Sequence, residues 1–156
     1  MRVVDAFLLS LDNAWEHDWE SLMSVLSGVT EEEARWQAPC YADAAAPESA
    51  PPPGTIRWQV THLAHYKREY TAQILGDREA QGPELPENST ATYEEDLADL
   101  RRAHLAERAA MAALGDEDLT PDLADFLTNI IRHDIWHGGQ IALARRLYRE
   151  RGSGSL

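Results

Sequence analysis

Cysteine is almost absent from this chain, and long apolar segments are missing altogether. Cys40 is the one cysteine among 156 residues, so no disulfide can form within the chain and no redox pair is available. No segment reaches the ~20 consecutive apolar residues that cross a bilayer, and residues 1–10 lack the basic and apolar regions of a secretory signal. We therefore expect one cytoplasmic domain over residues 1–156, without membrane contact.

Basic residues are also scarce. The chain has 14 Lys and Arg against 27 Asp and Glu, which gives a net charge of -13 at pH 7. A surface of this charge repels the phosphates of nucleic acids at long range. Nucleic acid is therefore not an expected partner, and a small-molecule substrate is expected instead.

Convincing strand patterns are absent as well, whereas apolar residues recur at three- and four-residue steps over most of the chain. Thr55, Thr92 and Thr120 stand where N-caps are expected, and glycines follow the apolar segments. The segments predicted to be helical are residues 4–28, 31–36, 56–76, 93–115 and 121–149, with long linkers over 39–54 and 77–91. The four longer helices bury their apolar faces most simply against one another, which predicts an all-α four-helix bundle. The sequence does not determine how the helices are connected within this bundle.

Two histidines of the last helix lie among its apolar residues. At 100° per residue, His133 and His137 fall on the same face as Ile130 and Ile141. Two imidazoles four residues apart lie one turn above each other, a spacing at which both can bind one cation. The alternative is a pair of core histidines that hydrogen bonds alone satisfy.

The helix over residues 56–76 offers a third histidine. Measured from Leu63, at the centre of its apolar face, His62 lies ~100° to one side, whereas His65 lies ~160° away and is expected to face water. Three protein ligands are typical of a catalytic zinc-type site, in which a further position stays open for water or substrate. The three histidines together favour metal binding over the core alternative.

Other residues of the last helix also need a physical reason. Asp134 points toward the core, where it either orients a metal ligand from behind or forms a structural salt bridge. Gly138 and Gly139 each cost ~1 kcal/mol relative to Ala in a helix interior, which indicates that another helix or a ligand approaches the backbone there. Trp136 lies opposite the core face and is a candidate for a dimer surface.

These residues resemble the DinB-like (DinB/YfiT) superfamily, whose members are regarded as metal-dependent enzymes. The resemblance rests mainly on the segment HDIWHGGQI over residues 133–141, together with the pair TI at residues 55–56, seven residues before His62. It implies a four-helix bundle in which His62, His133 and His137 hold a divalent metal, and it implies frequent dimerisation. In some relatives it also implies transfer or isomerisation chemistry that uses a low-molecular-weight thiol.

The function expected from these observations is that of a divalent-metal-dependent enzyme, a transferase that passes a low-molecular-weight thiol to a small electrophilic substrate. Two alternatives stay open: a non-catalytic, metal-binding stress-response bundle, and a hydrolase that uses a metal hydroxide. Imidazole ligands suit Zn, Ni, Mn and Fe, so the sequence does not assign the metal. We expect a homodimer in which Asp134 and Gln140 support the metal ligands from behind, and no residue is assigned as catalytic.

Overall fold

The computed structural model describes residues 2–18, 20–41, 51–77 and 92–151, and every regular element in these ranges is a helix. The long helices are α1 (Val3–Trp15), α4 (Ile56–Ile74), α5 (Tyr93–Ala112) and α6 (Pro121–Glu150). The short elements are α2 (Leu22–Leu26), α3 (Glu31–Arg35) and the 3-10 turns η1 (Pro39–Tyr41) and η2 (Asp116–Asp118). The predicted all-α fold is confirmed.

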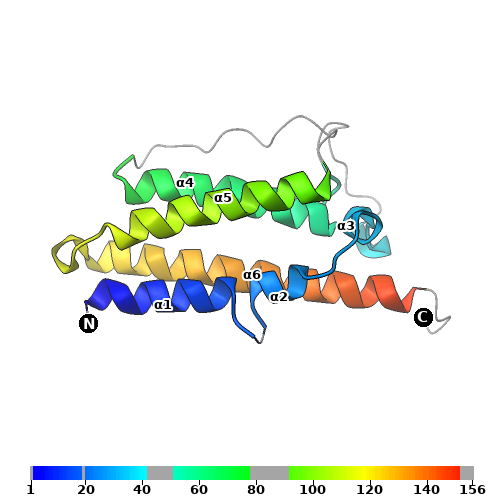
Figure 1. Cartoon of the computed structure of the whole chain (residues 1–156), viewed down its shortest axis with the longest axis horizontal. Coiled ribbons are helices and arrows are strands. Elements are labelled where there is room, and N and C mark those ends of the chain that lie inside the picture. Colours follow the sequence, from blue (N-terminus) through cyan, green and yellow to red (C-terminus); the bar gives the residue numbers. More distant parts are fainter. Residues whose placement is uncertain (1, 19, 42–50, 78–91, 152–156) are drawn as a thin grey trace.

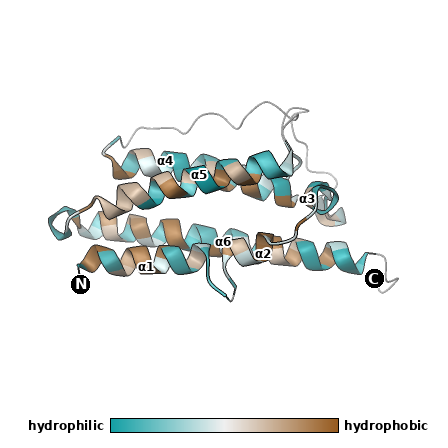
Figure 2. Cartoon of the chain, viewed as in Figure 1, coloured by the Kyte–Doolittle hydropathy of each residue, from teal (hydrophilic) through white to brown (hydrophobic). Residues whose placement is uncertain are grey.

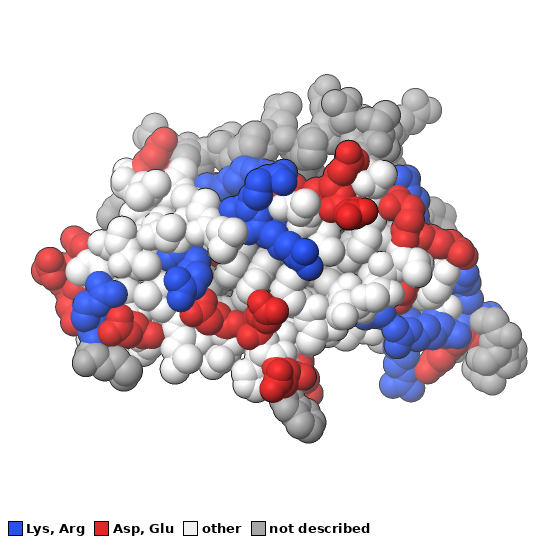
Figure 3. Space-filling model, in the orientation of Figure 1, with Lys and Arg blue, Asp and Glu red and all other residues white. Residues whose placement is uncertain are grey.

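The helices pack as two neighbouring layers. α4 and α5 lie along each other and make the most extensive contact, while α1 and α2 run along α6 (Figure 1). α1 also contacts α5, and α4 contacts α6. Each long helix carries both hydrophobic and hydrophilic residues (Figure 2), and acidic and basic side chains are intermixed on the face drawn in Figure 3. None of the described helices is long and apolar enough to span a membrane.

The first predicted helix is wrong in one respect, because it is interrupted. The apolar spacing predicts one continuous helix over residues 4–28, whereas α1 ends at Trp15 and α2 begins at Leu22. The described residues between them include Glu20, which is exposed and has a φ of 54°. Ser21 then caps α2 through its side chain. The exposed polar residues after α1 bury no apolar surface, so packing does not hold them in a helix.

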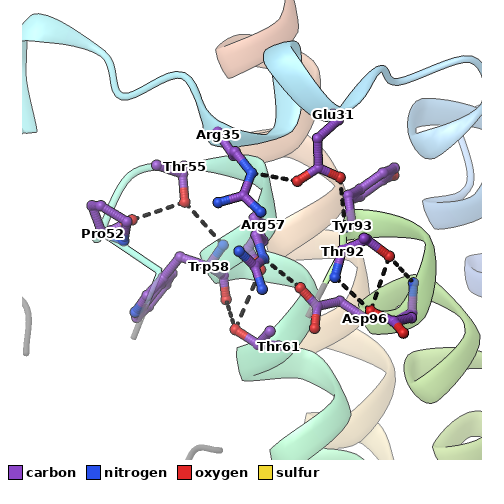
Figure 4. A network of polar contacts seen from close by, with 11 residues as sticks. Glu31, Arg35, Pro52, Thr55, Arg57, Trp58, Thr61, Thr92, Tyr93 and Asp96 are labelled. Atoms are coloured by element: carbon purple, nitrogen blue, oxygen red, sulfur yellow. Dashed lines mark hydrogen bonds and ion pairs between the residues drawn. The ribbon is translucent and has the colours of Figure 1, made fainter. Parts of the chain in front are cut away.

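The predicted N-caps explain where the other long helices begin. Thr55, Thr92 and Thr120 each accept a hydrogen bond from the backbone N–H three residues later, at 3.0 to 3.2 Å. Glu95 completes the capping box at the start of α5. Thr55 also donates to the carbonyl of Pro52 at 2.8 Å, as Figure 4 shows. These bonds satisfy donors that the first turn of a helix leaves unpaired.

A buried ion pair joins α4 to α5 near these caps. The Arg57 Nε atom donates to Asp96 Oδ2 at 2.6 Å, and both side chains are buried (Figure 4). Glu31 of α3 accepts a hydrogen bond from the backbone N–H of Tyr93 at 2.7 Å. Together these contacts hold the first turns of α4 and α5 against α3, which fixes the direction in which α4 carries His62.

Two apolar clusters make up the core, and polar side chains lie between them. On α4 the first cluster reaches Ala64 and the second includes Ile74. Between these levels α4, α5 and α6 contribute the buried side chains of Lys67, Glu107 and Asp134. The predicted metal ligands of α6 lie at the same level, because they flank Asp134 in the sequence.

Candidate metal centre

The three predicted ligands come together where α4 packs against α6; we call them the histidine cluster. His62 lies in the second turn of α4, and His133 and His137 lie one turn apart on α6. His62 and His133 are half-buried, and His137 is 5% exposed. His65 was predicted to face water, but it is half-buried, lies 4.0 Å from Glu69 and is outside the cluster.

The Nε2 atoms of the histidine cluster converge. The Nε2 atom of His133 lies 3.3 Å from that of His62 and 3.0 Å from that of His137. Two nitrogens bound about 2.0–2.1 Å from one ion lie about 2.8–3.4 Å apart for angles between 90° and 109°. The spacing therefore fits a shared cation.

Hydrogen bonding alone does not account for these contacts. An imidazole Nε2 atom carries either one proton or one lone pair, so it forms one hydrogen bond in the ring plane. The Nε2 atom of His133 nevertheless approaches two other nitrogens at hydrogen-bond distance. One of the two contacts is left unexplained in the core-histidine alternative, whereas a cation explains both.

Gln59 orients His137 from behind. Its Oε1 atom contacts the Nδ1 atom of His137, and the Gln59 side chain is buried. Because an amide oxygen only accepts, Nδ1 carries the proton and Nε2 keeps its lone pair on the side where the cluster converges. A partner of this kind is typical of histidines that bind metals. Gln59 was not among the residues predicted from the sequence, although a polar residue one turn before His62 was an available signal.

Burial keeps the three imidazoles neutral at pH 7. It lowers the pKa of His62 and of His133 to about 4, and that of His137 to about 3. The positive charge of Lys67 further lowers the pKa of His133. The other two imidazoles act in the same direction on His137, whereas Gln140 raises its pKa. Neutral imidazole is the form that binds a metal.

A comparison with known families covers all three histidines. The family model described as the DinB superfamily matches residues 14–141, which is more than half of the chain. The chain belongs to the DinB superfamily. No match to a curated protein or to a solved structure was found. Membership of the superfamily and the histidine cluster together fit a metal-binding protein.

Aromatic rings surround the histidine cluster of this DinB-superfamily chain. The ring of Trp58 stacks on His62 with 4.7 Å between centroids. Tyr66 lies 4.6 Å from His62 and 5.2 Å from His133, and Tyr70 lies 5.7 Å from His133. Burial raises the pKa of Tyr70 to about 12, so its hydroxyl stays protonated. These half-buried rings make the surroundings of the cluster largely apolar while leaving it partly open.

Asp134 forms a salt bridge. Among the described residues, no hydrogen bond joins it to a ring nitrogen of the histidine cluster. Lys67 Nζ donates to Asp134 Oδ2 and to Glu107 Oε2, at 2.7 Å in each case. None of the three side chains is more than 1% exposed. Gln140, the other residue predicted to support a ligand, has a buried Oε1 atom without a hydrogen-bond partner. Lys67 was not among the residues predicted from the sequence.

A second group of potential metal ligands adjoins this lysine: His104, Glu107 and Asp134, which we call the carboxylate cluster. His104 is buried, stacks on Trp15 at 3.7 Å and lies 4.0 Å from Glu107 Oε2. Burial raises the pKa of Glu107 to about 7 and also raises that of Asp134. Burial acts to lower the pKa of Lys67, but the two carboxylates outweigh it, so Lys67 stays charged.

The two glycines of α6 have no close neighbours. Apart from the adjoining residues and backbone of α6 itself, a Cβ atom at Gly138 or Gly139 would meet no heavy atom of the described residues within 4 Å, so packing among these residues does not explain the two glycines. Gly138 is buried next to His137, whereas Gly139 is exposed. A separate cavity of about 680 Å³ is lined by residues of α1, α2 and α5, including His104, and by no member of the histidine cluster.

Proposed function

We propose that His62, His133 and His137 bind one divalent metal ion and that this ion is the centre of an enzyme acting on a small molecule. The observation that carries the proposal is the convergence of their Nε2 atoms, with contacts of 3.0 and 3.3 Å. Three protein ligands leave at least one position for water or substrate. When bound, the ion supplies a positive charge that favours the deprotonated form of a thiol or a water molecule at that position.

The surrounding residues have separate tasks in this proposal. Gln59 holds the Nε2 lone pair of His137 toward the ion, because its amide oxygen accepts a hydrogen bond from the protonated Nδ1 atom on the other side of the ring. Trp58 and Tyr66 lie against His62 and limit the access of bulk water. Gly138 leaves room beside His137, since no side chain projects from it. These features favour a small substrate with an apolar part.

Within this function we propose the transfer of a low-molecular-weight thiol to a small electrophile. The one cysteine of the chain, Cys40, is exposed in η1 and is not a member of the histidine cluster. A sulfur nucleophile would therefore come from a second molecule, as the thiol chemistry of some DinB-like relatives suggests. Hydrolysis requires the same open position and is the alternative reaction. The cytoplasmic location stays a prediction.

The metal content of variants tests the ligands. Wild-type protein is stripped with a chelator, reloaded with Zn, Ni, Mn or Fe(II), dialysed and analysed by mass spectrometry for metal per chain. We expect one ion per wild-type chain and a sharp loss in His62→Ala, His133→Ala and His137→Ala. His65→Ala, on the same helix and outside the cluster, should retain the ion. Unchanged metal content in all three ligand variants would overturn the proposal.

An activity assay then separates the reactions. The metal-loaded protein is incubated with a panel of electrophiles, with and without low-molecular-weight thiols. Conjugation that needs thiol and is lost in His133→Ala supports transfer. Metal-dependent hydrolysis without thiol identifies a hydrolase, and a tightly bound ion without either activity indicates a non-catalytic metal-binding bundle.

A further inference from the structure

The cavity of about 680 Å³ lies between α5 and the first part of the chain, and no member of the histidine cluster lines it. It follows from the break after α1. α1 contacts α5, whereas α2 runs along α6 and leaves this side of α5 largely uncovered (Figure 1). Tyr93, Leu97 and Arg101 of α5 line the space that results. The volume falls within the range of about 300–1,000 Å³ that small-molecule sites usually have.

The walls of the cavity are largely apolar. Trp15, Leu26 and Tyr93 line it and are buried, and Met23 and Leu97 line it and are half-buried. All five residues belong to the first apolar cluster of the core or pack against it, so the core holds these walls in place. Preformed apolar walls favour a ligand with an apolar body.

One guanidinium at the cavity has no acidic partner. Arg101 lines the cavity, is exposed, and forms no hydrogen bond or ion pair with another described residue. Acidic partners are plentiful, because the chain has 27 Asp and Glu against 14 Lys and Arg. The neighbouring Arg102 does pair with one of them, Asp99, at 3.0 Å. The positive charge of Arg101 therefore stays available to an anion from outside the chain.

The other lining side chains limit the charge of that anion. His104 lines the cavity and stacks on Trp15, and burial lowers its pKa to about 3, so its ring is neutral at pH 7. Arg101 is therefore the one cation among the described lining residues. Glu16, which is exposed at the end of α1, also lines the cavity and repels a second negative charge. A ligand with one negative charge fits this balance better than a dianion such as a phosphate ester.

We propose that this cavity binds a small monocarboxylate with an apolar body. Its carboxylate pairs with Arg101, because the fork of guanidinium N–H groups matches the two carboxylate oxygens. Its apolar part lies against Trp15 and Leu97, where burial removes apolar surface from water. The site is distinct from the histidine cluster, and the proposal does not depend on the function proposed for the metal.

Isothermal titration of the metal-loaded full chain tests the proposal with three probes of equal chain length: octanoate, 1-octanol and octylammonium. Octanoate should bind at least about tenfold more tightly than 1-octanol, and octylammonium should bind most weakly. Arg101→Met should raise the Kd of octanoate at least about tenfold and change that of 1-octanol little. Arg102→Met is the matched control, because Arg102 is an exposed arginine of the same helix that does not line the cavity.

Three further variants locate the site. Leu97→Glu should weaken both octanoate and 1-octanol, with circular dichroism showing unchanged helix content, whereas Glu16→Gln should strengthen octanoate about two- to fivefold. His133→Ala should bind octanoate as the wild type does, and loss of binding in this variant would place the carboxylate on the metal instead. Equal Kd values for octanoate and 1-octanol would overturn the proposal, and so would equal effects of Arg101→Met and Arg102→Met.

Discussion

The histidine cluster and the carboxylate cluster offer the same number of metal-ligating side chains, but their charges are balanced differently. In the carboxylate cluster the ammonium group of Lys67 lies 2.7 Å from oxygens of both Glu107 and Asp134. The histidine cluster consists of neutral imidazoles whose Nε2 atoms converge at 3.0 and 3.3 Å. The number of ligands alone therefore does not identify a metal site. The carboxylate cluster contains its own cation, and we expect the histidine cluster to take one from solution.

Removing the internal cation should have the largest effect. Lys67→Met leaves two buried carboxylates unpaired, and the free energy of unfolding should fall by about 3–5 kcal/mol. Urea denaturation followed by circular dichroism measures this change. Arg68→Met is the matched control, because Arg68 pairs with Asp99 in a salt bridge that is about one-third exposed and should contribute at most about 1 kcal/mol. Equal losses in the two variants would contradict the role given to Lys67.

Adding a metal should stabilise the protein through the histidine cluster alone. At a free metal concentration of 100 times Kd, the free energy of unfolding of the wild type should rise by about 2.7 kcal/mol. His137→Ala should remove this increase, because it takes away a ligand. His104→Gln alters the carboxylate cluster, so its free energy of unfolding without metal should be lower than that of the wild type. Adding metal should still raise this free energy by the same amount. The opposite pattern would place the metal beside Lys67.

Changing the residue behind a ligand should have a smaller effect than removing the ligand. Gln59→Leu leaves all three imidazoles in place but frees the ring orientation of His137, so the metal Kd should rise about 10- to 100-fold. Gln73→Leu, on the same helix, removes only a contact with Glu69 and should leave Kd unchanged. Isothermal titration of the metal-free protein measures both values. An unchanged Kd in Gln59→Leu would show that this amide does not orient the ligand.

The smallest effect is expected from neutralising Glu107. Burial raises its pKa from an ordinary value near 4.5 to about 7 in the folded chain. As the pH rises from 4.5 to 7, the unfolded chain loses this proton before the folded chain does. The contribution of Glu107 to the free energy of unfolding therefore becomes more unfavourable as the pH rises through this range. Glu107→Gln should therefore raise the free energy of unfolding at pH 8, on the order of 1 kcal/mol. The gain should disappear near pH 4.5, and a gain that is independent of pH would contradict this assignment.

The parts predicted correctly from the sequence depend on neighbouring residues. Thr55, Thr92 and Thr120 cap helices through bonds to backbone groups three residues away, and the helical repeat places His133 and His137 on one face. Such features require no knowledge of the rest of the fold.

The parts that were missed depend on residues far apart in the chain. Lys67 meets Glu107 and Asp134 across 40 and 67 positions, and a buried lysine runs against the usual exposure of this residue type. Gln59 meets His137 across 78 positions. The break after α1 has the same origin, because regular apolar spacing does not reveal where packing against other helices stops.

An anomalous-scattering map of metal-loaded crystals, recorded at the absorption edge of the bound metal, tests the central claim most directly. The account predicts one peak per chain, about 2.0–2.1 Å from the Nε2 atoms of His62, His133 and His137, with a non-protein ligand at a further position. The carboxylate cluster should show no peak, because the ammonium group of Lys67 lies there. A peak between His104, Glu107 and Asp134, or no peak at the histidine cluster, would contradict the account.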